Sequence, residues 1–151
     1  MRWLEQHAWW GLLFMTVTLV AFGVGDVVVG PAADRGIPLG LTGMTLEELQ
    51  AEGPASYRLF DFFTRVNGNS LLLAGLFGTA ILLFAFRHDQ PWAWWTMWLL
   101  PLWALGVTAF YLVAGVQADQ PPPPPLVSGP IFALVAAAIL LVSTPRFFPR
   151  R

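Results

Sequence analysis

The stretch YRLFDFFTRVNGNSLLLAGLFG, residues 57–78, joins a charged, aromatic segment directly to an apolar one. Arg58, Asp61 and Arg65 lie in its first half, and the apolar second half continues without charge to Phe86. An uncharged run of about 20 residues is long enough to cross the ~30 Å hydrocarbon core of a bilayer as a helix. The stretch therefore predicts a membrane-spanning helix whose first turns carry charged side chains.

Three further apolar segments of similar length occur on either side of this one. The predicted spans cover residues of about 8–27, 64–86, 91–116 and 126–144, and a long outer loop covers residues 28–56. None of the runs shows the period-two alternation of a membrane β-strand. We therefore expect an all-α integral membrane protein, a four-helix bundle that forms a single domain over residues 1–151.

The composition agrees with a membrane protein and excludes several other classes. Of the 151 residues, 56% are hydrophobic and 11% are charged, whereas soluble domains contain roughly 25% charged residues. The net charge of −1 and the lack of a basic stripe exclude nucleic acid as a partner. No cysteine is present and only two histidines, so we predict no metal site, no catalytic residue and no cofactor.

The arginines predict the orientation in the membrane, because basic residues gather in short cytoplasmic flanks. The short flanks contain five arginines: Arg2, Arg87, Arg146, Arg150 and Arg151. The long acidic loop and the start of the second span contain three: Arg35, Arg58 and Arg65. This asymmetry predicts a multi-pass protein of the bacterial inner membrane with both termini in the cytoplasm. Aromatic residues beside the cytoplasmic flanks are typical of the membrane interface.

Two connections carry recognisable local signals. Thr45 and Glu48 form a capping-box pattern, and Gly53-Pro54 is a stop signal, which together predict a short extracytoplasmic helix over about residues 46–52. This helix would cover the outer mouth of the bundle. The run of five prolines at residues 121–125 predicts a stiff extended spacer between the third and fourth spans.

The charged start of the second span is the candidate site. At about 100° per residue, Arg58, Asp61, Arg65 and Asn69 fall on one face, and Asn67 falls on the opposite face. Two interpretations remain open. The charges either suit the solvated membrane interface, or they point into the outer mouth and bind a ligand. In the second case Arg65 would bind the head of an anionic or carbonyl-bearing amphiphile, Asp61 would orient its guanidinium, and Asn69 would add a contact.

Small residues at intervals of four predict where the spans pack. Ser70, Ala74 and Gly78 recur in the second span, with Gly68 and Gly75 alongside, and the fourth span repeats the spacing at Gly129, Ala133 and Ala137. Small residues allow membrane helices to approach closely. We expect these stripes to form contacts within one chain, with a homodimer face as the alternative.

The segment RVNGNSLLLAGLFG, residues 65–78, places Arg65 three residues before Gly68, and Gly75 a heptad further on. This pattern resembles the second helix of the DoxX-like small membrane proteins of bacteria, which are compact four-helix bundles. Some members of that group are linked to quinone-dependent redox complexes. The resemblance implies the bundle and a lipid-like ligand or a complex partner, and it supplies no catalytic residue.

These observations favour a non-catalytic membrane protein that acts as an accessory subunit or binds a lipid- or quinone-like amphiphile at its extracytoplasmic mouth. The expected partners are membrane lipids, together with a protein of a membrane complex or a second copy of the chain. An intramembrane enzyme acting on a lipid or quinone is the alternative, and a small transporter is less favoured. The two middle spans lack carboxylates at the depth where such chemistry or transport needs them.

Overall fold

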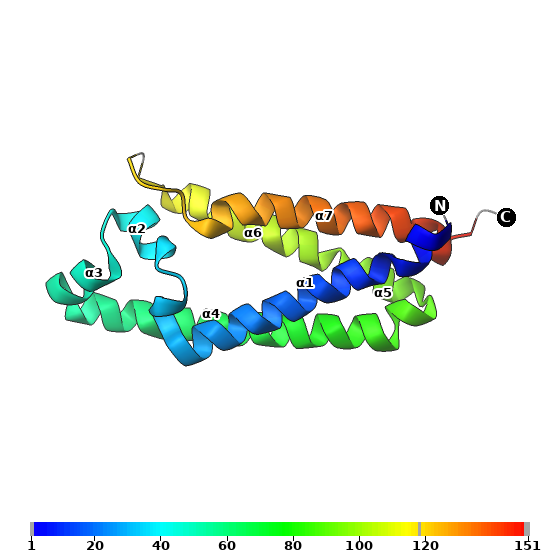
Figure 1. The fold of residues 1–151 in the computed structure, drawn as a ribbon, viewed down its shortest axis with the longest axis horizontal. Helices are drawn as coiled ribbons and strands as arrows, with labels where there is room; N and C mark the ends of the chain where they lie inside the picture. The colour runs from blue at the N-terminus through cyan, green and yellow to red at the C-terminus, as the bar shows by residue number, and fades with distance from the viewer. Residues whose placement is uncertain (1, 118, 150–151) are drawn as a thin grey trace.

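Helices account for nearly all of the computed structural model, which describes the backbone of residues 2–117 and 119–149 and the side chains from His7 onward. The long helices are α1 (Arg2–Val29), α4 (Pro54–Phe84), α6 (Leu99–Ala114) and α7 (Pro124–Phe147), and α5 (Pro91–Met97) leads into α6 (Figure 1). Short helices occupy the connections: η1 (Gly30–Ala33), α2 (Gly36–Thr42), α3 (Leu46–Glu52) and η2 (Phe86–His88).

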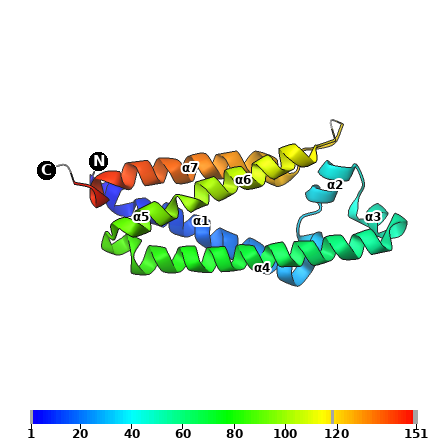
Figure 2. The ribbon, with the colours of Figure 1, turned by 180° about the vertical axis from the view of Figure 1, so that it is seen from behind.

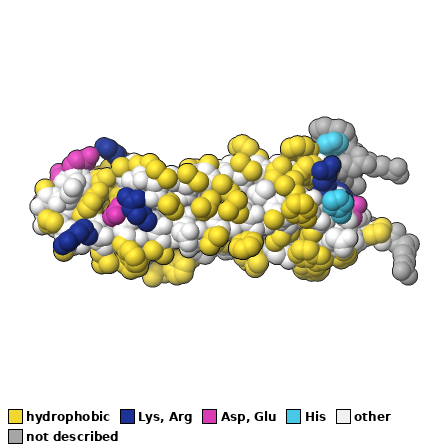
Figure 3. Space-filling view, turned by 90° about the horizontal axis from the view of Figure 1, so that it is seen from below, with side chains coloured by type: hydrophobic (Ala, Val, Ile, Leu, Met, Phe, Trp, Pro, Cys, Tyr) yellow, Lys and Arg dark blue, Asp and Glu magenta, His cyan; other side chains and the backbone are white. Residues whose placement is uncertain are grey.

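The predicted all-α membrane bundle is confirmed. Within the described residues, four helical segments are long and apolar enough to cross a membrane: His7–Ala33, Pro54–His88, Pro91–Ala114 and Pro124–Phe147. Figure 3 shows apolar side chains along the middle of the molecule, whereas charged side chains gather near its two ends and histidines near one of them. This distribution suits a hydrocarbon core between two polar headgroup layers.

The two ends of the bundle differ in structure. The turn end contains η2, the start of α5 and both chain termini, and the cap end contains η1, α2 and α3 (Figures 1 and 2). The predicted capping helix is α3. Its N-cap Thr45 accepts a hydrogen bond from the Glu48 N–H at 3.2 Å, and the Glu48 carboxylate accepts one from the Thr45 N–H at 2.7 Å. The hydrogen bond from the Thr45 N–H lowers the pKa of the exposed Glu48 carboxyl.

Helix α1 connects the two halves of the bundle, because it packs against both α4 and α7, and α6 packs against α7. Toward the cap end the pair α1–α4 diverges from the pair α6–α7, and α2 lies there between the two pairs (Figures 1 and 2). At the turn end the apolar core is closed by Trp9, Phe86, Trp94 and Phe147. The Trp94 indole N–H donates to the main-chain oxygen of Leu140 at 2.9 Å.

Glycines allow α1 and α4 to approach closely. A Cβ on Gly23 would lie 2.7 Å from the Gly68 oxygen, and a Cβ on Gly68 would lie 2.9 Å from the Gly23 oxygen. Further along, a Cβ on Gly75 would lie 2.8 Å from the Thr16 oxygen. These contacts are too short for any side chain larger than hydrogen, so glycine sets the separation of the two helices.

The predicted stripe of small residues on the second span is partly wrong. Gly78 is buried against Thr16, but Ser70 and Ala74 are exposed. The contact face instead follows Gly68, Gly75 and Gly78, because the residues that face α1 recur at intervals of seven and three. On the fourth span Gly129 contacts Thr108 of α6, and Ala133 is buried.

The third span and the proline run differ from the sequence-based expectation. The third span is not continuous, because its helix breaks at Trp98 between α5 and α6. Pro101 has no N–H to donate to the Met97 carbonyl, which explains the break. The five prolines are not a free spacer either. Pro124 and Pro125 open α7, since proline suits the first helical turn, and the ring of Pro123 packs on Gly40 of α2.

We predict that Gly75→Leu destabilises the detergent-solubilised protein, because the new side chain meets the backbone of α1 at Thr16 and Val20. Overpacking of this kind costs about 1–3 kcal/mol. The neighbouring Ala74→Leu, on the exposed side of α4, is the matched control and should melt close to wild type. Equal melting temperatures for both variants would mean that α4 meets α1 through a different face.

Candidate functional site

The predicted site lies at the cap end, where α4 extends beyond the apolar part of the bundle. Helix α4 has 31 residues and is therefore about 46 Å long at 1.5 Å per residue, well over the ~30 Å of hydrocarbon. Its first turns lie beside α3 (Figure 1), and Arg65 is level with the end of α1. The four predicted residues, Arg58, Asp61, Arg65 and Asn69, lie in the cap-end half of this helix.

Arg65 binds Asp61 and the end of α1 at the same time. Its Nε donates to both carboxylate oxygens of Asp61 at 3.1 and 3.0 Å. Its Nη1 donates to the main-chain oxygens of Val27 at 2.5 Å and Val28 at 3.4 Å. Carbonyls in the last turn of a helix have no intrahelical donor, and a positive charge is favourable there. Arg65 therefore acts as a side-chain cap for α1.

Gly30 explains why the Asp61–Arg65 pair fits so closely against α1. Its φ of +68° takes the chain out of α1 and into η1, a conformation that favours glycine. A Cβ at this position would lie 2.5 Å from Asp61 Oδ1 and 2.9 Å from Arg65 Nη2. The turn and the ion pair are thus packed in direct contact, a feature that helical spacing on α4 does not reveal.

Arg58 and Asn69 do not join this pair. Both side chains are exposed, and among the described residues neither forms a hydrogen bond or ion pair. Phe62 lies four residues after Arg58 on the same side of α4 and is 59% exposed. The structure therefore divides the predicted set into an inner pair, Asp61 and Arg65, and an outer pair, Arg58 and Asn69, beside an exposed aromatic ring.

A second polar group at the cap end was not found from the sequence. Asn67, predicted to lie opposite the site, reaches the carboxylate of Asp26 in α1 at 3.5 Å. Asp34 accepts a hydrogen bond from the Gly36 N–H at 3.2 Å, and burial raises the pKa of the Asp34 carboxyl despite that bond. The Asn67–Asp26 hydrogen bond joins α4 to α1, and the Asp34 hydrogen bond lies in the turn that follows η1.

The chemistry available at the inner pair is hydrogen-bond donation from a fixed cation. Arg65 keeps Nη2 without a hydrogen-bond partner among the described residues, and its side chain is 43% exposed. In the described part of the chain no three His, Cys, Asp or Glu side chains come together as metal ligands. The arrangement can hold acceptor oxygens, such as those of a phosphate, carboxylate or carbonyl group.

Comparisons of the chain with protein-family models, with curated protein sequences and with solved structures found no match. The resemblance of residues 65–78 to the DoxX-like proteins therefore stays a prediction.

Proposed function

We propose that this chain is a non-catalytic multi-pass protein of the bacterial inner membrane that binds the head of an amphiphile at its cap end. It would do so on its own or as an accessory subunit of a membrane complex. The observation that carries the proposal is the immobilised guanidinium of Arg65, which retains an unpartnered Nη2 at headgroup depth. A donor whose orientation is already fixed loses less conformational freedom when a ligand binds.

The surroundings of Arg65 favour a ligand that is polar at one end and apolar at the other. Arg58 supplies a second guanidinium without an acidic partner among the described residues. Phe62 and Val66 are exposed nearby on α4 and offer apolar surface to an acyl or isoprenoid chain. Together these groups suit a lipid- or quinone-like molecule with acceptor oxygens in its head.

The orientation is part of the proposal. The cap end would face away from the cytoplasm, because its loop is acidic and the short flanks at the turn end contain most arginines. Trp9, Trp10, Trp92 and Trp95 lie at the turn end, as interfacial aromatic residues do. The orientation prediction also rests on Arg2, Trp3, Arg150 and Arg151. The structure does not describe the side chains of these four residues.

Cysteine labelling tests this orientation, since the chain contains no cysteine of its own. Glu52 and Asp119 are exposed at the cap end, and Gln90 is exposed at the turn end. Each of these residues is replaced by cysteine in a separate variant. In intact cells an impermeant thiol reagent should label the first two and leave Gln90→Cys unlabelled. Labelling of Gln90→Cys alone would invert the topology and place the candidate site in the cytoplasm.

Native mass spectrometry of the protein purified in mild detergent tests the ligand. Arg58→Gln should reduce retention of a co-purified amphiphile about fivefold, the effect of roughly 1 kcal/mol per basic residue at a membrane surface, without changing the melting temperature. Arg65→Gln should lower both retention and melting temperature, because Arg65 also holds the end of α1.

The matched control for this experiment is Arg35→Gln. Arg35 is an exposed cap-end arginine that is already paired with Glu47 at 3.0 Å, so its loss should leave retention unchanged. Equal retention in wild type, Arg58→Gln and Arg65→Gln would refute the site and leave these arginines with only a structural and interfacial role.

A further inference from the structure

The turn between α4 and α5, at the opposite end from the proposed site, has a fixed backbone. Helix α4 ends at Phe84, and the chain then passes through η2 and through Asp89, whose φ is +59°. The Gln90 N–H closes the turn by donating to the Ala85 oxygen at 3.2 Å.

Phe86 is fully buried and contacts the ring of Phe147, with 4.6 Å between the ring centroids. The buried ring anchors the turn, and the next two side chains, Arg87 and His88, are exposed.

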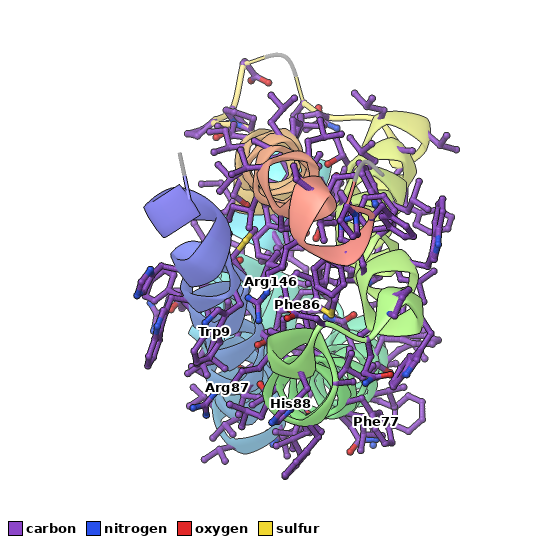
Figure 4. All side chains as sticks on the ribbon, turned by 90° about the vertical axis from the view of Figure 1, so that its right-hand side faces the viewer. Trp9, Phe77, Phe86, Arg87, His88 and Arg146 are labelled. Carbon is purple, nitrogen blue, oxygen red and sulfur yellow. The ribbon has the colours of Figure 1, made fainter. Side chains whose placement is uncertain are left out.

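Arg146 of α7 occupies the acceptors of this turn. Its Nε forms an ion pair with the Asp89 carboxylate, and its Nη2 donates to the Arg87 main-chain oxygen at 2.6 Å. Its side chain is mostly buried, and Figure 4 shows it beside Phe86 and Arg87. Among the side chains described at the turn end, Asp89 is the one carboxylate. With Asp89 paired to Arg146, neither Arg87 nor His88 has an ion-pair partner in that part of the chain.

The Arg87 guanidinium lies over an aromatic ring at the membrane interface. Its central carbon is 5.6 Å from the centroid of the Trp9 ring, and Trp9 is buried in the core. Trp10 stacks on Trp9 at 4.3 Å and is 56% exposed. A cation–π contact leaves the N–H groups at the edge of the guanidinium available to a second partner. Figure 3 shows basic side chains between two patches of histidine surface at this end.

We propose that the turn end binds the phosphodiester of an anionic phospholipid, with Arg87 as the main contact and His88 beside it. The planar donor fork of arginine matches the oxygens of a phosphodiester. Indole rings prefer headgroup depth, so exposed Trp10, stacked on the Trp9 ring that Arg87 covers, would contact the glycerol region of the same lipid. These apolar contacts favour a lipid over free phosphate. This second lipid site involves neither the residues nor the membrane leaflet of the amphiphile site at the cap end.

The test is a titration of the delipidated protein with phosphatidylglycerol and with phosphatidylcholine of the same acyl chains, followed by native mass spectrometry. Wild type should bind phosphatidylglycerol more tightly, and the preference should shrink at higher ionic strength because salt screens exposed charges. Arg87→Gln should weaken phosphatidylglycerol binding about fivefold and leave phosphatidylcholine binding unchanged. Arg87→Lys, which keeps the charge but loses the planar donor fork, should retain only part of the preference, and a melting curve for each variant verifies folding.

Three results would overturn the proposal. The first is a wild type that binds both lipids equally. The second is a loss of phosphatidylglycerol binding in Arg58→Gln but not in Arg87→Gln, which would place the anionic lipid at the cap end alone. The third is displacement of the lipid by inorganic phosphate but not by chloride at the same ionic strength, which would indicate a free-anion site. Arg35→Gln, an exposed arginine at the cap end that is paired with Glu47, is the control and should behave as wild type in all arms.

Discussion

Helices α1 and α4 pack through their backbones, and this contact determines the positions of the polar residues at the cap end. Membrane helices gain little from burying apolar side chains against each other, since lipid is equally apolar, so close van der Waals packing must supply the attraction. Gly23, Gly68 and Gly75 make that packing available by removing the side chains that would separate the helices. The hydroxyls of Thr16 and Thr79 form a hydrogen bond across the same interface at 3.0 Å.

The site at the cap end follows from this contact. Once Gly68 lies against α1, Arg65 stands one turn earlier on α4, level with the last carbonyls of α1. A related arrangement recurs at the turn end, where Arg146 donates to the Arg87 carbonyl and pairs with Asp89. At each end one arginine binds a main-chain carbonyl of another element and a carboxylate, and a nearby arginine, Arg58 or Arg87, stays exposed. The cap-end proposal rests mainly on the held Arg65, and the turn-end proposal rests on the exposed Arg87.

Local signals in the sequence predicted local structure well. The Thr45–Glu48 pattern places α3 correctly because a capping box involves only neighbouring residues. The i, i+4 spacing likewise predicts the Asp61–Arg65 pair.

The features that the sequence did not predict are mainly contacts between helices. The sequence missed the contact between Asn67 and Asp26, because helical angles on α4 do not show that α1 passes close enough for Asp26 to accept a hydrogen bond. The break at Trp98 follows from Pro101, because a proline inside an apolar span removes a helical hydrogen bond even where the hydropathy is uniform.

A cysteine pair tests the α1–α4 interface most directly, because the chain contains no other thiol. The hydroxyl oxygens of Thr16 and Thr79 lie 3.0 Å apart, so sulfur atoms in Thr16→Cys/Thr79→Cys need only a small shift to reach the ~2.04 Å of a disulfide. We expect mild oxidation in the membrane to remove maleimide reactivity from this variant and not from the control Thr18→Cys/Thr79→Cys. Thr18 faces another side of α1, where its hydroxyl donates to the Phe14 oxygen. Cross-linking of the control pair in preference to the Thr16 pair would contradict the packing of α1 against α4 on which this account depends.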